Sequence, residues 1–359
     1  MSDIAALAQI AFTLIVGMYF FMHLKNESGN DRDLKKEYST EAENLNRLRH
    51  IRLNEPMSEC SRPSNADEII GQEDGIKALR AALWGANPQH VLIYGPPGVG
   101  KTAAARIIME EVKKSADSPF KKDAPFIETD ATIMRRDEYG FADPLIGSVH
   151  DPIYQGAGLL GQSGIPQPKI GAVTKAHGGI LFIDEIGELP NEQINKLLKV
   201  LEDRRVNLES SYYNSSMKKI PPYIRDIFDN GLPADFRLIG ATTAEPKKIP
   251  DAIRSRCIEV YFNKLTRGDI LKIVGMCATR CSIAIENGVK EIIADYAQNG
   301  RDAVKILQCA YNLSKMEERC VVSREDAKWV IKANRYEKRE DLVIETDKIV
   351  DISLIKPFN

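Results

Sequence analysis

The spacing of hydrophobic positions changes along the chain. A continuous apolar run without acidic or basic residues extends from Ile4 to Leu24. Short apolar runs that end in polar residues follow at 90–94, 179–185 and 236–243, a pattern typical of buried parallel strands. After Phe262 the spacing becomes that of amphipathic helices. The pattern predicts an N-terminal apolar segment, an α/β domain with a parallel sheet, and a small all-helical domain.

The N-terminal run is long enough to cross a bilayer as a helix, which takes about 20 residues. Asp3 precedes it and Lys25 follows it, whereas a cleaved signal peptide begins with basic residues. By the positive-inside rule we expect an uncleaved, single-pass membrane anchor over 1–25, a polar tether over 26–55, and a cytoplasmic location for the bulk of the chain. A buried core helix is the alternative interpretation.

The helical pattern near the C-terminus predicts a lid domain. We expect four helices, at Asp269 to Cys281, Val289 to Gln298, Arg301 to Met316 and Arg324 to Ala333. Ser323 and Asp326 have the spacing of a helix cap. The predicted domains are the α/β domain over 56–263, the lid over 264–335 and a charged tail over 336–359.

The composition excludes several classes of protein. With 359 residues, 43% hydrophobic and 28% charged, the chain is an ordinary globular protein. Its net charge of -2 gives no general attraction to nucleic acid. Six scattered cysteines favour a reducing compartment over a disulfide framework. We interpret Cys277 and Cys281 as helix core, because no histidine lies nearby to complete a zinc site.

The first candidate site is a phosphate-binding loop that follows the apolar run 90–94. It matches G-x-x-x-x-G-K-[ST] and contains Gly95, Pro96, Pro97, Gly98, Val99, Gly100, Lys101 and Thr102. Its glycines let backbone amides surround phosphates, and the following helix N-terminus favours anions. Lys101 is expected to reach the outer phosphates of ATP, and Thr102 to hold Mg²⁺.

The second half of the site ends the run 179–185. Four apolar residues precede Asp184 and Glu185. Ligands bind at the carboxyl ends of parallel strands, so we expect Asp184 to face Mg²⁺ and Glu185 to polarise the attacking water. A solvated strand end is the alternative.

These motifs, together with Phe236-Arg-Leu-Ile-Gly-Ala-Thr-Thr243 and Ile249-Pro-Asp-Ala-Ile-Arg-Ser-Arg256-Cys257, resemble those of AAA+ ATPases. The stretches from Asp143 to Gly158 and from Ala172 to Gly179 resemble the ATPase part of membrane-anchored bacterial B-type Lon proteases. The resemblance extends to about Asn334. It implies a P-loop AAA+ domain with a helical lid that uses ATP and Mg²⁺.

The resemblance also implies site residues. Ile70 and Gly71, with Ile69, look like the adenine-side segment of the family. Thr243 corresponds to the polar residue that orients the lytic water, with Thr242 as its neighbour and competing candidate. Packing at the strand end is the alternative for both threonines.

Two arginines receive roles in the same way. Arg256 corresponds to the arginine finger that reaches the nucleotide of a neighbouring subunit, with Arg254 as the competing candidate. Arg301 resembles the lid arginine that senses bound nucleotide; a surface role is the alternative.

An arginine that acts on a neighbour requires a ring, usually a hexamer in this family. Its substrates would be unfolded polypeptides. In the family, loops such as the insertion 147–179 face a central channel, and Tyr154, Leu159 and Leu160 are the candidates for gripping a polypeptide. An ordinary hydrophobic anchor for the loop is the alternative. Residues 206–235 form a second insertion, which resembles a hairpin region of Lon-type motors.

B-type Lon proteases continue into a peptidase domain with a serine and lysine dyad, and this sequence ends at Asn359. We therefore expect an unfoldase without its own peptidase site, working with a separate peptidase or a full-length relative. A DNA-acting AAA+ motor, similar to branch-migration helicases or clamp loaders, is one alternative. An ATP-binding regulatory remnant is another.

Overall fold

The computed structural model describes residues 16–18, 44–50, 57–133, 143–150, 165–210, 212–214 and 220–339. The chain divides into two units, Met1–Pro56 and Met57–Asn359. In the first unit, 16–18 and 44–50 are helical and exposed.

No helix within these described ranges is long and apolar enough to cross a membrane. The expectation of a membrane-spanning helix therefore finds no support in the structure. The predicted anchor lies outside the described residues except for 16–18.

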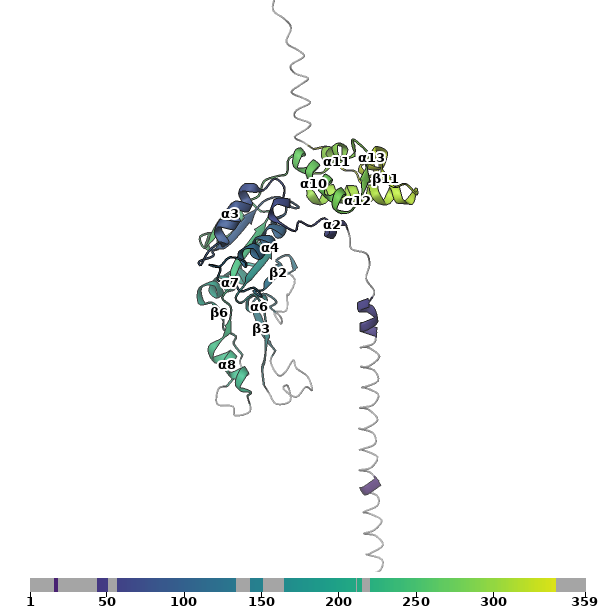
Figure 1. Cartoon of the computed structure of the whole chain (residues 1–359). Coiled ribbons are helices and arrows are strands. Elements are labelled where there is room, and N and C mark those ends of the chain that lie inside the picture. Colours follow the sequence, from purple (N-terminus) through teal and green to yellow (C-terminus); the bar gives the residue numbers. More distant parts are fainter. Residues whose placement is uncertain are drawn as a thin grey trace, which may run out of the picture. The chain divides into compact units, whose positions relative to one another are not determined.

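A five-stranded parallel sheet organises the second unit (Figure 1). Its order is β2 (Phe126–Asp130), β5 (Ile180–Asp184), β8 (Arg237–Thr242), β1 (His90–Tyr94) and β9 (Cys257–Tyr261). The three strands expected from the apolar runs are thus the three central ones. Each step from strand to neighbouring strand is parallel, so all five carboxyl ends lie at one edge of the sheet.

The strands are apolar on both faces because helices cover both faces. Successive side chains of a strand point to opposite faces. Accordingly, Val91 and Ile93 of β1 belong to one buried cluster, and Leu92 and Tyr94 belong to the other. The first cluster includes residues of α3 (Glu73–Leu83) and α4 (Lys101–Val112). The second includes residues of α6 (Ala172–Lys175), α7 (Asn191–Asp203) and α9 (Asp251–Arg254).

The lid contains the four expected helices, drawn from green to yellow in Figure 1. They are α10 (Arg267–Arg280), α11 (Val289–Tyr296), α12 (Gly300–Met316) and α13 (Arg324–Ala333), with the short pair β10 (Ala284–Ile285) and β11 (Val321–Val322). Ser323 and Asp326 form the expected capping box of α13, and Thr266 and Asp269 form another before α10. The lid core is continuous with the first cluster of the sheet.

The segment after α13 packs back onto the lid. Arg339 is 1% exposed, and its guanidinium donates to the carbonyls of Ala297 and Leu265 at 3.0 and 2.7 Å. The lid therefore includes residues from the start of the segment that the sequence pattern assigns to a charged tail.

Both insertions are partly described. The first contains the antiparallel pair β3 (Gly147–His150) and β4 (Gln167–Ile170); Tyr154, Leu159 and Leu160 lie outside the described residues. The second contains β6 (Arg205–Val206), α8 (Pro222–Asn230) and β7 (Leu232–Pro233). The helix α8 contacts β4, and Ile165, Ile220 and Ile224 form a small buried cluster. The two insertions therefore support each other.

The remaining elements of this unit are short: α2 (Met57–Cys60), η1 (Ala66–Glu68), η4 (Ile186–Glu188) and η5 (Pro246–Lys248).

Candidate nucleotide site

A cavity of 710 Å³ lies where the sheet edge, the segment before α3 and the lid meet. Lys101 and Thr102 of the phosphate loop, Asp184 and Glu185 after β5, and Arg301 of α12 all line it. These residues come from three distant parts of the sequence, and the fold brings them to one cavity.

The phosphate loop leaves the carboxyl end of β1 and enters α4. Gly98 and Gly100 have φ values of 71° and 98°, which favour glycine over residues with a side chain. Gly100 is the N-cap of α4, and no described side chain caps this helix. The amides of its first turn are therefore available to bind phosphate oxygens.

Lys101 is 7% exposed, and its ammonium donates to the carbonyls of Gly95 and Pro96 at 2.6 and 3.0 Å. Burial lowers the pKa of Lys101, while Glu185 and Asp184 act in the opposite direction. The buried ammonium of Lys101 donates to neutral carbonyl groups, and a bound triphosphate would supply negative charge to pair with it.

The two carboxylates after β5 have different environments. Burial raises the pKa of Asp184, and the amide of Glu185 donates to its Oδ1 at 3.1 Å. Glu185 has a φ of 48°, a left-handed conformation that is costly for a residue with a side chain. Such strain is common at functional sites, where the surrounding structure holds it in place.

Thr243 contacts Glu185 directly. Its amide and its hydroxyl both donate to Oε2 of Glu185 at 3.0 Å. Thr242 is fully buried, and its hydroxyl accepts the amide of Ala244 at 3.0 Å. Of the two threonines, Thr243 is thus the one that meets the predicted catalytic carboxylate.

These residues fit ATP and Mg²⁺. The open amides of α4 and Lys101 suit phosphates, and the hydroxyl of Thr102 and the carboxylate of Asp184 are oxygen ligands of the kind that Mg²⁺ prefers. The raised pKa of Asp184 fits the same assignment, because a bound cation would stabilise its charged form.

The lid touches the phosphate loop at the start of α12. The amide of Gly300 donates to the carbonyl of Gly98 at 3.2 Å. A Cβ on Gly98 would lie 2.7 Å from Oδ1 of Asn299 and 3.3 Å from Cγ of Arg301. Only a glycine allows this approach, which places Arg301 beside the phosphate loop.

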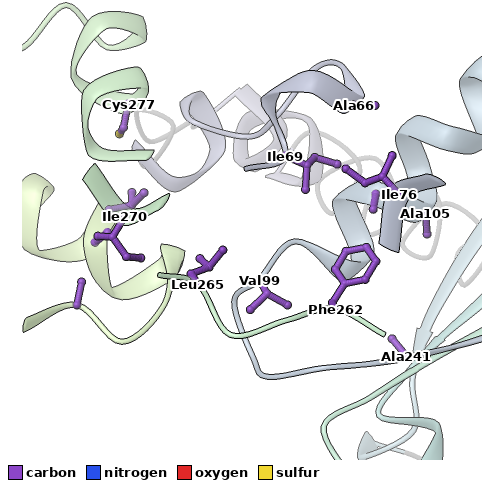
Figure 2. Packing of buried hydrophobic residues seen from close by; sticks show 14 of the residues in the cluster. Ala66, Ile69, Ile76, Val99, Ala105, Ala241, Phe262, Leu265, Ile270 and Cys277 are labelled. Atoms are coloured by element: carbon purple, nitrogen blue, oxygen red, sulfur yellow. The ribbon is translucent and has the colours of Figure 1, made fainter. Parts of the chain in front are cut away.

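The expected adenine-side segment lines the cavity in part. Ile69 and Ile70 line the cavity, and Cγ2 of Ile69 lies 3.2 Å from the position of a Cβ on Gly100. Gly71 does not line the cavity; it has a φ of 74° and packs against the carboxylate of Asp269. Figure 2 shows Leu265 and Val99 between Ile270 of the lid and Ile69.

Neither Arg256 nor Arg254 lines the cavity of its own chain. Arg254 is held by Glu259 at 2.8 Å and by Asp251 at 3.3 Å. Arg256 donates to the carbonyl of Ala252 at 2.8 Å and forms an ion pair with Glu202. Its side chain is 38% exposed. An arginine in this position is suited to act on a neighbouring subunit rather than on its own nucleotide.

The sequence analysis missed two contacts around the cavity. Arg280 of α10 forms an ion pair with Glu68 at 2.7 Å and holds the pKa of Glu68 at about 2. Gln72 exchanges two hydrogen bonds of 2.8 Å with the backbone of Asn263, directly before the lid. Glu68 and Arg280 are 212 residues apart in the sequence, and Gln72 bonds to a backbone group 191 residues away. No local sequence pattern therefore marks either contact.

This sheet order, with β8 between the phosphate-loop strand β1 and the acidic strand β5, and the helical lid define the AAA+ P-loop fold. Residues 65–218 match the family model of magnesium chelatase, subunit ChlI. The solved structure of the Thermotoga maritima RuvB Holliday junction branch migration motor is similar, with a TM-score of 0.51 and 22% identity over 76% of this chain and 73% of that chain. At this identity the likeness concerns the fold alone.

Among sequences, the chain is 53% identical to Lon protease 2 of Bacillus subtilis (strain 168) over 351 residues. The match covers 98% of this chain and 64% of that protein. The chain is also 27% identical to DNA polymerase III subunit gamma of Buchnera aphidicola, over 71% of this chain and 60% of that protein. It thus spans less than two thirds of the length of both relatives. The expected resemblance to the ATPase part of Lon-type proteins is confirmed.

Proposed function

We propose that this chain is an ATP-hydrolysing, Lon-like AAA+ motor that couples hydrolysis to the unfolding and translocation of polypeptides in ATP-dependent proteolysis. The observation that carries the proposal is the hydrogen bond from Thr243 to Glu185, a carboxylate that lines the same cavity as Lys101. This contact supports the proposal because a carboxylate held in one direction could polarise a water for attack on the outermost phosphate of ATP. Bound Mg²⁺ would supply charge neutralisation at the phosphates.

Ring assembly is part of the proposal. Arg256 is exposed and does not line the cavity of its own chain, so its predicted role requires a neighbouring subunit. The paired insertions are the candidate polypeptide contacts. Tyr223 on α8 is 60% exposed beside the buried cluster of Ile165, Ile220 and Ile224. We assign no peptidase site to these 359 residues.

The test is ATP turnover of the full chain with and without unfolded casein, beside Glu185→Gln. The matched control is Glu192→Gln, an exposed carboxylate on the next helix. Turnover that casein stimulates, and that disappears only in Glu185→Gln, supports the motor. Absence of turnover in the unaltered chain contradicts it. Casein fragments on a gel would contradict the assignment of no peptidase site.

The same assay addresses the polypeptide contact. Tyr223→Ala should reduce stimulation by casein while leaving basal turnover unchanged. Trp329→Ala, which removes an exposed aromatic residue of the lid, is the control. Stimulation by DNA in place of casein, with a strong dependence on salt, would instead favour a DNA-acting motor.

A further inference from the structure

Two cysteines far apart in the sequence meet beside the nucleotide cavity. Cys60 is the last residue of α2, and Cys281 directly follows α10 of the lid. Their Sγ atoms are 3.2 Å apart, across a sequence separation of 221 residues. All six cysteines are free thiols. A disulfide bond of about 2.0 Å would require only a small approach of these two sulfurs.

The two cysteines lie where noncovalent contacts already join the segment 57–68 to the lid. Arg280, the neighbour of Cys281, donates to the carbonyl of Arg62 at 2.6 Å and pairs with Glu68. Both Arg280 and Glu68 line the nucleotide cavity, as does Cys277 one helical turn before Cys281. A covalent bond between Cys60 and Cys281 would therefore fix the lid to the segment 57–68 at the rim of this cavity.

The thiols differ in access. Cys60 is exposed, Cys281 is half-buried and Cys277 is buried. Burial raises the pKa of Cys281 to about 12 and also raises the pKa of Cys277. Because the thiolate is the reactive form, a soluble oxidant meets Cys60 first. No group of three or more metal-binding side chains is found in the described part of the chain, so a metal site is not the better explanation.

We propose that Cys60 and Cys281 form a reversible disulfide that fastens the lid and slows the nucleotide cycle. The oxidant is a low-molecular-weight disulfide. The Cys60 thiolate attacks one of its sulfurs, forms a mixed disulfide and releases one thiolate. Cys281, deprotonated by solvent, then attacks Sγ of Cys60 and expels the second thiolate. The two cysteine thiols are oxidised, and the small disulfide is reduced to two thiols.

The consequence follows from the position of the bond. The cavity is lined by residues of both the lid and the α/β domain, and in the proposed motor the lid must move relative to that domain during turnover. A crosslink at the rim opposes this movement. Reduction by a dithiol restores it, which makes the pair a modification site responsive to the thiol state of the compartment.

The test uses the full chain, oxidised with glutathione disulfide and mapped by mass spectrometry of non-reduced peptides. We expect a Cys60–Cys281 crosslink, release of a fluorescent ADP about tenfold slower than in the reduced protein, and recovery with dithiothreitol. Cys60→Ser and Cys281→Ser should each abolish the effect. Cys320→Ser, which removes another exposed thiol, should behave like the unaltered chain.

Two results would overturn the proposal. One is the absence of the Cys60–Cys281 peptide after oxidation. The other is equal slowing of ADP release in Cys60→Ser, which would assign the effect to another thiol. Both readouts are independent of ATP hydrolysis, so failure of the proposed motor function is distinguishable from failure of the disulfide.

Discussion

The amide and the hydroxyl of Thr243 donate to the same carboxylate oxygen of Glu185, each at 3.0 Å. The two residues follow β8 and β5, which pair in parallel, so their contact lies at the shared carboxyl edge of the sheet. The carboxylate is thereby fixed in direction by a residue of a different strand. A general base needs such positioning as much as it needs a suitable pKa.

The first prediction concerns that hydroxyl. Thr243→Val keeps the shape of the side chain and removes one of the two hydrogen bonds. We expect kcat for ATP to fall about 10- to 100-fold with little change in KM, since the loss affects positioning for the chemical step. Thr243→Ser should retain most of the activity. An equal loss in the serine variant would show that the hydroxyl is not responsible.

The second prediction concerns Lys101. Lys101→Met should weaken binding of a non-hydrolysable ATP analogue about 100-fold, because a buried cation that meets the phosphates is lost. The nucleotide-free protein should unfold at the same temperature or higher, since burial disfavours the charged form of Lys101. Isothermal calorimetry and thermal melts measure the two effects. Lys114→Met, an exposed lysine two residues after the end of α4, is the control. An equal loss of affinity in that variant would refute the assignment of Lys101.

The third prediction tests whether Arg256 acts on a neighbour. Arg256→Ala and Glu185→Gln should each be inactive alone. Mixed together, they should regain turnover, because a Glu185→Gln subunit supplies Arg256 to a neighbour that keeps Glu185. Arg254→Ala should instead lower thermal stability, since Arg254 is held by Glu259 and Asp251 within the chain. Mixtures that stay inactive would count against an arginine finger in trans.

The fourth prediction concerns acid stability of the lid. The guanidinium of Arg319 and the amide of Ser323 hold the pKa of Asp326 at about 2, below its usual 3.8. Because the folded pKa is lowered, the stabilisation is present above pH 3.8 and is lost as the pH falls towards 2. It amounts to about 2 kcal/mol.

Asp326→Asn should therefore lower the free energy of unfolding by about that amount at pH 7 and flatten its dependence on pH between 4 and 2. Urea unfolding at several pH values measures this. Glu325→Gln, one residue earlier and exposed, is the control and should change neither quantity. If the free energy of unfolding of Asp326→Asn changed with pH as steeply as that of the unaltered chain, the prediction would be wrong.

Much of the architecture was predictable because it follows from local patterns. The apolar runs that end at Tyr94, Asp184 and Thr243 correspond to the three central strands, since buried parallel strands need apolar residues on both faces. The lid helices followed from periodicity and caps, and the helix predicted at Arg324 to Ala333 has the same bounds in the structure.

The rest depends on contacts between distant residues. The choice between Thr242 and Thr243 required the position of Glu185, because both threonines have the same local sequence. Periodicity correctly put Cys277 in the helix core. The same expectation for Cys281 was wrong, because Cys281 follows the end of α10, is half-buried and meets a thiol from α2. The sequence pattern assigns Arg339 to a charged tail. Its partners, the carbonyls of Ala297 and Leu265, lie close to it only in the folded lid.

The hydrogen bond from the amide of Gly300 to the carbonyl of Gly98 has a thermodynamic consequence. The first turn of the lid helix α12 and the phosphate loop share one contact, so filling the loop and reorienting the lid are a single coupled equilibrium. Linkage is reciprocal. If the two lid orientations differ in nucleotide affinity by a given factor, nucleotide shifts the equilibrium between them by the same factor. A neighbouring subunit, a substitution or a crosslink that favours one orientation therefore changes the affinity for nucleotide, by at most that factor.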